Sequence, residues 1–280
     1  CMNFSSKPIW QPTSRQIDSA SITRFAEESG IQWGRSFVDY RALHDWSVKQ
    51  PEEFWISVWD FCGIRAATRG KRVLERFSTV PGARFFPDAR LNFARNLLHR
   101  RDDGLAICFR SEDRVERSLT YDELYLQVAE VACGLQNAGI EPGDRVCAYM
   151  PNMPETVIAM LATTAIGAVW SSCSPDFGTQ GVLDRFGQIE PRILFSADGY
   201  YYNGKQHDSL AKLAEIREGL PSVEKVVVAP LVSEPMIGTV RDAVVWHDFS
   251  INADNVNFVD LPFNHPLYIL YSSGTTGVPK

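Results

Sequence analysis

Apolar residues after position 140 fall into two alternating kinds of segment. Short continuous apolar runs, typical of strands buried on both faces, occupy residues 145–150, 168–172, 192–197, 225–229, 243–246 and 267–273. They are separated by helix-like segments at 154–166, near 180–189 and near 208–218. Because strands that alternate with helices form parallel sheets, we predict an α/β fold with a predominantly parallel sheet layered with helices. Ligands bind such sheets at the carboxyl ends of the strands.

Two elements before this region have clear local signals. The strand-like runs at 105–110 and 115–119 flank a polar turn, which predicts a hairpin. Thr120 and Glu123 have the spacing of a capping box and precede an apolar helical stripe. We expect Gly139 to end this helix, because glycine readily adopts the left-handed conformation found after helix ends.

Residues 1–103 are rich in aromatic side chains and show almost no strand-like alternation. Helical spacing after Pro51 predicts a helix that ends at Gly63, and a second helix is expected at 90–98 with Asp88 near its start. We interpret the tryptophans of this region as core residues, namely Trp10, Trp33, Trp46, Trp55 and Trp59. Residues 1–103 are therefore expected to form a helical and irregular covering segment before the α/β region.

Composition narrows the functional classes. The 280 residues are 45% hydrophobic and 22% charged, which is ordinary for a globular protein. Lys and Arg (28) are outnumbered by Asp and Glu (34), and the net charge of -6 disfavours nucleic acid as a partner. The longest apolar stretch, 157–170, is too short to span a bilayer, and the first residues lack the pattern of a signal peptide. The six cysteines form no C-x-x-C pair and no metal-site spacing, so we expect a reduced, cytoplasmic protein.

The most informative motif is YSSGTTGVPK at residues 271–280. Glycines let backbone N–H groups approach an anion, serine and threonine hydroxyls add donors, and Lys280 adds a positive charge. This composition after a buried strand predicts a phosphate-binding loop. The loop is not a Walker A motif, because only two residues separate Gly274 from Gly277 and a proline precedes Lys280. A P-loop kinase or GTPase is therefore disfavoured.

The sequence SSGTTGVPK after a strand resembles the phosphate-loop signature of the acyl-adenylate-forming synthetases. Further stretches agree in order and spacing with the acetyl-CoA synthetase branch of that family, among them RLNFARNLL at 90–98 and ILFSADGYYYNGK at 193–205. The resemblance extends from near Trp10 to Lys280. It implies that residues 1–103 are the amino-terminal covering segment of this branch. Residues 104–280 would then be the first part of the large AMP-binding (adenylation) domain, truncated at the phosphate loop.

The resemblance implies a two-step reaction that uses ATP, Mg²⁺ and coenzyme A. A carboxylate attacks the α-phosphorus of MgATP and releases pyrophosphate, and the thiol of coenzyme A then captures the acyl-adenylate. The residues expected to bind the ATP phosphates are Ser272, Ser273, Gly274, Thr275, Thr276, Gly277 and Lys280. Thr276 is expected to be catalytic because donors at this loop stabilise the charge that builds on the departing pyrophosphate. Lys280, the second catalytic candidate, is expected to be an electrostatic partner of pyrophosphate.

The family's coenzyme A surface includes the loop after 168–172 and a basic position within 198–205. Lys205 matches that position and is a candidate for binding the 3′-phosphate, although a solvated surface lysine is equally compatible with the sequence. Asp176 and Phe177 are candidates for the coenzyme A path, whereas Asp176 could instead cap the following helix. Cys173, beside this loop, is interpreted as inert because no paired base accompanies it.

The same loop bears on the acid substrate. Members of the acetyl branch usually carry Phe-Gly-Gly-Phe where this chain has SPDF at residues 174–177, which argues against acetate. The resemblance of residues 171–178, 181–191 and 202–207 to one kind of member of the branch implies a short 3-oxo acid instead, and this choice rests on the resemblance alone. The main hypothesis is therefore a synthetase whose adenine pocket, magnesium ligand and catalytic lysine lie beyond Lys280, so that the 280 residues are a fragment, inactive alone. A synthetase for another short-chain acid and a non-catalytic nucleotide-binding or interaction module remain alternatives. The expected partners are small molecules, and no oligomeric state is predicted.

Overall fold

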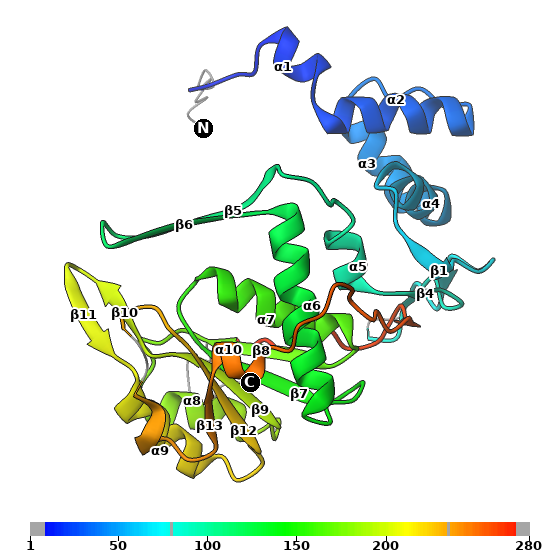
Figure 1. Cartoon of the computed structure of the whole chain (residues 1–280). Helices are drawn as coiled ribbons and strands as arrows, with labels where there is room; N and C mark the ends of the chain where they lie inside the picture. The colour runs from blue at the N-terminus through cyan, green and yellow to red at the C-terminus, as the bar shows by residue number, and fades with distance from the viewer. Residues whose placement is uncertain (1–8, 79–80, 234–235, 273–280) are drawn as a thin grey trace, which may run out of the picture. The chain divides into compact units, whose positions relative to one another are not determined.

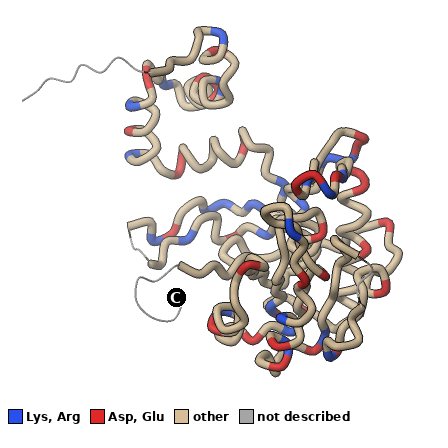
Figure 2. Tube along the Cα trace, turned by 90° about the vertical axis from the view of Figure 1, so that its left-hand side faces the viewer, with Lys and Arg blue, Asp and Glu red and all other residues tan. Residues whose placement is uncertain are grey.

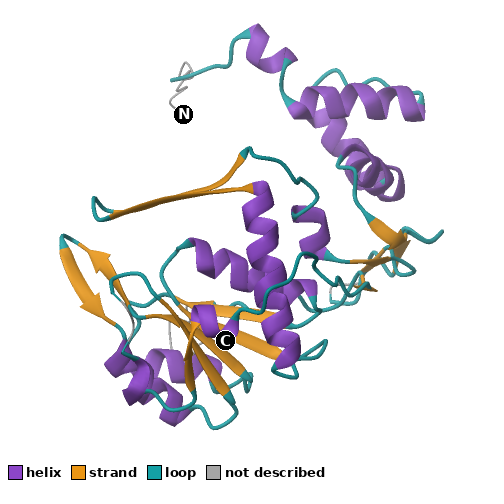
Figure 3. Cartoon of the chain, viewed as in Figure 1, coloured by secondary structure: helices purple, strands orange, loops and turns teal. Residues whose placement is uncertain are grey.

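The structure is a computed structural model that describes residues 9–78, 81–233 and 236–272. The chain divides into two compact units, the first made of Cys1–Ile64 and Gly70–Pro87 and the second of Arg65–Arg69 and Asp88–Lys280. Figure 3 shows that helices dominate the first unit, whereas strands and helices alternate in the second. The boundary predicted from the sequence, between a covering segment at 1–103 and the adenylation domain from residue 104, stays a prediction.

The first unit is built mainly from helices. Its elements are α1 (Ser14–Asp18), α2 (Ser21–Trp33), α3 (Tyr40–Lys49), α4 (Pro51–Phe61), β2 (Leu74–Glu75) and β3 (Arg84–Phe85). Pro51 starts α4, where its missing N–H costs nothing, and Gly63 follows the helix with φ of 60°. The helix predicted from Pro51 to Gly63 is therefore confirmed.

Aromatic side chains form the core of this unit. Phe25 and Trp46 are buried, and Phe54 contacts both rings in edge-on geometry. The interpretation of the tryptophans as core residues is confirmed at Trp46 and Trp59, which are both buried. It is wrong at Trp10, because 70% of the surface of this residue is exposed.

A five-stranded parallel sheet organises the second unit (Figure 1). Its strands are β7 (Arg145–Tyr149), β8 (Val169–Cys173), β9 (Ile193–Ala197), β12 (Lys225–Ala229) and β13 (Ala243–Val245). They lie in the order β13-β12-β9-β7-β8, and every neighbouring pair is parallel. The predicted α/β fold with a predominantly parallel sheet is confirmed.

Helices cover both faces of this sheet. One layer holds α6 (Tyr121–Asn137), α7 (Pro154–Ala165) and α10 (Trp246–Phe249), and the other holds α8 (Thr179–Phe186), α9 (Leu210–Gly219) and the short 3₁₀ helix η1 (Ile237–Thr239). Because side chains alternate along a strand, β7 directs Val146 and Ala148 to the first layer and Cys147 and Tyr149 to the second. This two-sided burial explains why the strands are apolar throughout.

Helix α6 begins and ends as predicted. The hydroxyl of Thr120 accepts the N–H of Glu123 at 3.1 Å, and the Glu123 carboxylate accepts the N–H of Thr120 at 2.8 Å. These reciprocal bonds form a capping box. Gly139 follows the end of the helix with φ of 77°, a conformation that costs other residues energy.

The second unit also contains two hairpins. The first, β5 (Leu105–Ser111) with β6 (Val115–Thr120), is the hairpin predicted from its polar turn. The second, β10 (Gly199–Tyr202) with β11 (Lys205–Asp208), is not among the predicted elements. A signal for it exists in Asn203 and Gly204, because Asn-Gly favours the two-residue turn in which both residues take positive φ.

The helix predicted at 90–98 is shorter in the structure. Arg90–Leu91 form strand β4, and α5 covers only Phe93–Leu97. The capping side chain is Asn92 rather than Asp88, and it accepts the N–H of Arg95 at 3.1 Å. Strand β4 pairs with β1 (Ala66–Thr68) and β14 (Leu261–Pro262). The first residues of the expected helix are therefore part of a sheet.

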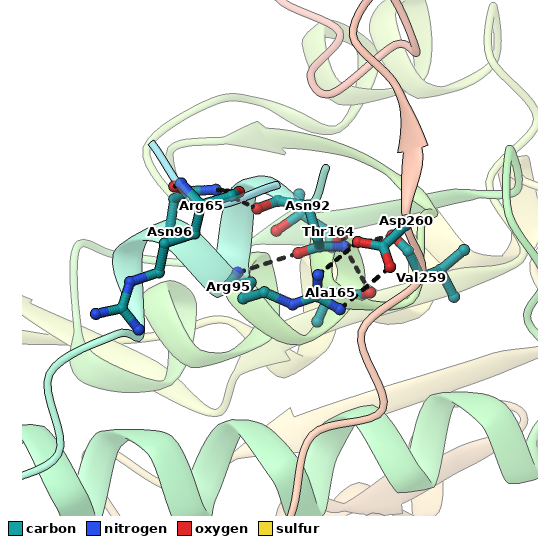
Figure 4. A network of polar contacts seen from close by, with 8 residues as sticks. All are labelled: Arg65, Asn92, Arg95, Asn96, Thr164, Ala165, Val259 and Asp260. Carbon is teal, nitrogen blue, oxygen red and sulfur yellow. Dashed lines mark hydrogen bonds and ion pairs between the residues drawn. The ribbon is translucent and has the colours of Figure 1, made fainter. Parts of the chain in front are cut away.

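Asn92 ties α5 to distant parts of the chain, as Figure 4 shows. It is 1% exposed, and its side-chain nitrogen donates to three carbonyl oxygens at 3.2, 2.9 and 2.9 Å, those of Thr164, Ala165 and Val259. Arg95 of the same helix pairs with Asp260 at 2.5 Å. The segment before β14 is thereby fixed against the end of α7.

Residues 267–272 run alongside β8 without forming a regular strand. The N–H of Trp170 donates to the carbonyl of Leu267 at 3.1 Å, and the N–H of Ile269 donates to the carbonyl of Trp170 at 2.9 Å. Trp170 and Tyr268 form a single parallel bridge. The prediction of a strand at 267–273 is therefore wrong for the described residues 267–272. The direction of this segment along the sheet is nevertheless the expected one.

Charged residues of both signs are interspersed along the trace of the second unit (Figure 2). This mixture accords with the small excess of acidic over basic residues in the sequence. Within the described ranges, no helix combines the length and the apolar character needed to cross a bilayer.

Candidate functional site

The carboxyl ends of the parallel strands bring together the loops in which a ligand is expected. Strand β7 ends at Tyr149, which lies opposite Cys173 of β8 on one side and Ser196 of β9 on the other. Residues 174–178 and the hairpin β10–β11 follow β8 and β9 directly, and residues 267–272 run parallel to β8 toward the same edge. This edge is the candidate site.

Tyr149 holds the loop that follows β8. Its hydroxyl lies 2.6 Å from the carbonyl oxygen of Pro175 and 3.0 Å from that of Phe177, and donates to this pair. Burial is the largest cause that raises the pKa of Tyr149 to about 12, and the nearby Tyr200 and Asp176 add to it. The hydroxyl therefore keeps its proton at neutral pH and acts as a structural donor.

The same loop carries two of the predicted coenzyme A residues. Asp176 is exposed, whereas Phe177 is half-buried under Arg185, whose guanidinium carbon lies 4.6 Å from the ring centre. Helix α8 has Gly178 at its cap position and no side-chain capping bond. The alternative in which Asp176 caps this helix is therefore wrong, and its carboxylate lies exposed at the candidate site.

Arg185 also connects this loop to the segment that leads into the predicted phosphate loop. The hydroxyl of Tyr271 donates to the carbonyl oxygen of Arg185 at 2.7 Å, and the guanidinium carbon lies 6.0 Å from the Tyr271 ring centre. Burial is the main cause that raises the pKa of Tyr271 to about 12, so this donor stays protonated. The hydroxyl of Ser171 donates to the carbonyl of Ile269 at 2.8 Å, which fixes the segment to β8.

Most of the predicted phosphate loop lies outside the described residues. Only Ser272 is described, and it is exposed at the end of the segment that Tyr271 anchors. The assignments of the remaining residues stay predictions, namely those of Ser273, Gly274, Thr275, Thr276, Gly277 and Lys280. The described segment brings the chain to the carboxyl edge of the sheet just before this loop begins.

The hairpin β10–β11 carries Lys205, the predicted ligand of the 3′-phosphate. Lys205 pairs with Tyr202 beside the turn, and both residues are exposed. Closer to the sheet, the rings of Tyr200 and His207 stack with centroids 4.9 Å apart and an interplanar angle of 14°. Burial and the charge of Asp176 raise the pKa of Tyr200, so the base of the hairpin lies near the loop after β8. The role of Lys205 stays a prediction.

Asp198 is a buried acid at this edge that the sequence analysis missed. It is 2% exposed, and its carboxylate accepts three N–H groups at 2.7, 3.1 and 2.8 Å, those of Leu231, Val232 and Ser233. An acidic residue directly after the apolar strand β9 is the signal that could have revealed it. Asp198 joins the start of the hairpin β10–β11 to the loop after β12.

Cys173 lies at the end of β8 and is buried. Burial is the main cause that raises its pKa to about 11, so the thiol is almost entirely protonated at neutral pH. Within the part of the chain that the structure describes, no group of three or more His, Cys, Asp or Glu side chains is placed to hold a metal ion.

Comparisons with known proteins agree with this arrangement. A family model described as AMP-binding enzyme matches residues 95–280, and one described as acetyl-coenzyme A synthetase N-terminus matches residues 40–97. The first of these covers the sheet, both hairpins and the predicted phosphate loop.

Individual relatives match nearly the whole chain. An acetoacetyl-coenzyme A synthetase of Rhizobium meliloti (strain 1021) is 47% identical over 276 residues, which are 98% of this chain and 42% of the relative. A malonamoyl-CoA synthetase of Penicillium aethiopicum is 37% identical over 97% of this chain and 40% of its own length. A solved acetoacetyl-CoA synthetase structure from Streptomyces lividans has a TM-score of 0.91 and 42% identity, covering 98% of this chain and 42% of that chain. The chain thus spans about 42% of the length of the first of these relatives. It belongs to the family of AMP-binding enzymes, in the acetyl-coenzyme A synthetase branch that its motifs resemble.

Proposed function

We propose that the protein containing this chain joins acetoacetate to coenzyme A, with ATP as the energy source. An acyl-adenylate is the intermediate, and AMP and pyrophosphate are the products. The observation that carries the proposal is the convergence of three segments at one edge of the sheet. These are the loop 174–178, the hairpin with Lys205 and the segment that leads into the SSGTTGVPK loop.

The phosphate loop is proposed to bind the β- and γ-phosphates of ATP. Negative charge builds on pyrophosphate as it departs, so donors held around it stabilise the transition state more than the ground state. Thr276 would supply one such donor, and Lys280 would add a mobile positive charge. Mg²⁺ would neutralise part of the phosphate charge when it is bound, and we assign none of the described residues to it.

Coenzyme A is proposed to approach along the loop after β8 and the hairpin β10–β11. Lys205 is exposed on this hairpin, so its ammonium group is accessible to a phosphate group. It offers one positive charge rather than the bidentate fork of an arginine. Phe177 and Asp176 lie on the neighbouring loop, where an aromatic face and an acid could line the same path.

The proposed acid substrate rests on the loop 174–178 and on the chemistry that two relatives share by name. Acetoacetate and malonamate are both short acids with a carbonyl group on the third carbon. The sequence SPDF at residues 174–177 departs from the stretch usual for acetate activation. We therefore assign this chain to a short 3-oxo acid, and to acetoacetate first, because the relative named for it has the higher identity.

We propose that the protein works in the cytoplasm on small molecules and binds no nucleic acid. The described cysteines Cys62, Cys108, Cys133, Cys147 and Cys173 are free thiols, which suits a reducing compartment. The net charge of -6 works against contact with a phosphate backbone.

The test is acid-dependent exchange of labelled pyrophosphate into ATP, measured on a full-length polypeptide that contains this chain. Acetoacetate, malonamate, acetate and butyrate would be compared at equal concentrations. Faster exchange with acetoacetate than with the other acids supports the proposal. Exchange that is fastest with another acid keeps the adenylation chemistry and replaces the substrate. No exchange with any acid would favour the non-catalytic nucleotide-binding module.

A further inference from the structure

The turns of the two hairpins meet beside the candidate site (Figure 1). Glu112 lies in the turn between β5 and β6, and Gly204 lies in the turn between β10 and β11. The two carboxylate oxygens of Glu112 accept the N–H of Gly204 at 3.0 and 3.3 Å, across 92 positions of sequence. The guanidinium carbon of Arg114 also lies 6.0 Å from the ring centre of Tyr201. The turn next to Lys205 is therefore held by an acid from another hairpin.

The bond between Glu112 and Gly204 fits the geometry of both turns. The ladder of the second hairpin runs from Gly199 opposite Asp208 to Tyr202 opposite Lys205, so Gly204 lies beyond its last pair. Asn203 and Gly204 have φ of 53° and 71°, and Glu112 has φ of 50°. Both turns thus contain residues in the left-handed conformation. In the tight turn between β10 and β11, the N–H of Gly204 remains available to an acceptor outside the ladder.

The base of the same hairpin is fixed by buried contacts. Asp198 binds the loop after β12 through its carboxylate, and its carbonyl oxygen accepts the N–H of Ser209 at 3.0 Å. Gly199 leaves no room for a side chain, because a Cβ there would lie 2.4 Å from the carbonyl oxygen of His207. The base of the hairpin is therefore held by buried hydrogen bonds and close packing, whereas the turn is held by an exposed contact with Glu112.

We propose that Glu112 is a positioning residue for Lys205. By holding the N–H of the preceding residue, its carboxylate fixes the turn and with it the direction in which Lys205 presents its charge to the 3′-phosphate of coenzyme A. This inference rests on the proposed function of Lys205. The role assigned to Glu112 is indirect, because its carboxylate is negatively charged and would repel the phosphate that Lys205 attracts.

Charge and position predict opposite effects at Glu112. Coenzyme A carries several negative charges, so removal of a nearby carboxylate would, through charge alone, strengthen its binding. Loss of the bond to Gly204 would weaken binding, because Lys205 would have to be ordered again each time coenzyme A binds. The sign of the change therefore separates the two explanations.

The first experiment measures steady-state kinetics on a full-length polypeptide that contains this chain. Glu112→Ala is expected to raise the KM for coenzyme A about threefold to tenfold, the range for one exposed hydrogen bond, with unchanged pyrophosphate exchange. Glu112→Gln removes the charge but keeps an acceptor oxygen, and it should stay close to the wild type. The matched control is Glu116→Ala, because Glu116 is an exposed acid that pairs with Arg110 on the same hairpin at 2.9 Å. A KM that falls in both Glu112 variants would overturn the proposal.

The second experiment measures amide hydrogen exchange at Gly204 in the same variants. Glu112→Ala should speed exchange at this amide about threefold or more, whereas Glu116→Ala should not change it. Equal exchange in the wild type and Glu112→Ala overturns the inference without reference to any activity. If Lys205→Ala raises the KM for coenzyme A and Glu112→Ala does not, the inference fails and the proposed function stands. If neither variant changes the KM although exchange speeds up, the assignment of Lys205 fails, and the positioning role fails with it.

Discussion

The hydroxyl of Tyr271 donates a hydrogen bond of 2.7 Å to the carbonyl oxygen of Arg185. The donor directly precedes the phosphate-loop motif, and the acceptor lies in helix α8, whose amino end follows the loop 174–178. The same arginine also packs over Phe177. One residue thus connects the starting point of the proposed ATP loop with the proposed coenzyme A path, although the two are distant in sequence.

Removal of this hydroxyl should slow adenylation while leaving the fold intact. In Tyr271→Phe the ring still fills its half-buried site, but the bond to Arg185 is lost. We expect acetoacetate-dependent pyrophosphate exchange to fall about threefold to tenfold, the effect of one hydrogen bond worth about 0.5–1.5 kcal/mol. Tyr268→Phe is the control, because the Tyr268 hydroxyl donates a weak hydrogen bond to the sulfur of Met160 at 3.4 Å. Equal rates in Tyr271→Phe and the wild type would contradict the anchoring role.

The side chain of Asn92 should contribute more to the free energy of unfolding than the more exposed side chain of Asn96. Asn92→Ala would leave three carbonyl oxygens without their shared donor at a site that is 1% exposed. The expected loss is about 2–4 kcal/mol of unfolding free energy, because the partly buried carbonyl of Val259 loses this donor and α5 loses its capping side chain. The carbonyls of Thr164 and Ala165 still accept the N–H groups of Gly167 and Val259. Asn96→Ala, in the same helix, removes more exposed bonds to Arg65 and should cost less than half as much. Urea unfolding gives the midpoints of the wild type, Asn92→Ala and Asn96→Ala. Similar losses of stability in the two variants would contradict the greater contribution of Asn92.

The fold was largely predictable because local patterns and the final structure agree in the sheet region. Apolar runs separated by helical segments predict buried parallel strands, and the capping box at Thr120 defines a helix start without any tertiary information. The error at residues 90–98 has a tertiary cause. Strand β4 forms because β14 lies against it from far along the chain, and this pairing competes with a sequence that otherwise suits a helix.

The site was predictable only in its chemistry. Residue type and glycine content indicate a phosphate loop, but no local pattern reveals that Tyr271 bonds to Arg185 or that Glu112 bonds to Gly204. These contacts depend on which elements the sheet brings together. The hairpin β10–β11 is a different case, because its Asn-Gly turn was visible in the sequence and the tyrosines before it suit a strand.

Thr276 should contribute to the adenylation step rather than to coenzyme A binding. Thr276→Ala removes one hydroxyl donor from the proposed phosphate loop, and the expected loss is about 10-fold or more in pyrophosphate exchange. Thr276→Ser keeps the hydroxyl and should retain most of the rate. The KM for coenzyme A, measured in the complete reaction, should not change. An unchanged exchange rate in Thr276→Ala would refute the assignment.

Lys205 should affect coenzyme A and leave adenylation alone. Lys205→Ala is expected to raise the KM for coenzyme A about threefold to tenfold, as a partly solvated ion pair with a phosphate would. Lys205→Arg preserves the charge and should remain near the wild type. Because exposed ion pairs are screened by salt, the difference between wild type and Lys205→Ala should shrink as ionic strength rises. A difference that does not depend on salt would point to a role in the hairpin itself.

Cys173 should prove inert as a nucleophile, and its burial gives this prediction a definite dependence on pH. Its pKa of about 11 leaves about one thiol in a thousand ionised at pH 8. Iodoacetamide at that pH should therefore label the exposed Cys62 and Cys108 quickly and Cys173 far more slowly, as peptide mapping would show.

The folded state holds the Cys173 proton more tightly than the unfolded state, in which the pKa is about 8.5. The stability gained from this group is thus complete below about pH 8.5 and is lost as the pH rises toward 11, so Cys173→Ala should flatten the alkaline loss of stability. Rapid labelling of Cys173 in the folded protein, together with loss of adenylation in Cys173→Ala, would instead identify a reactive thiol at the carboxyl end of β8.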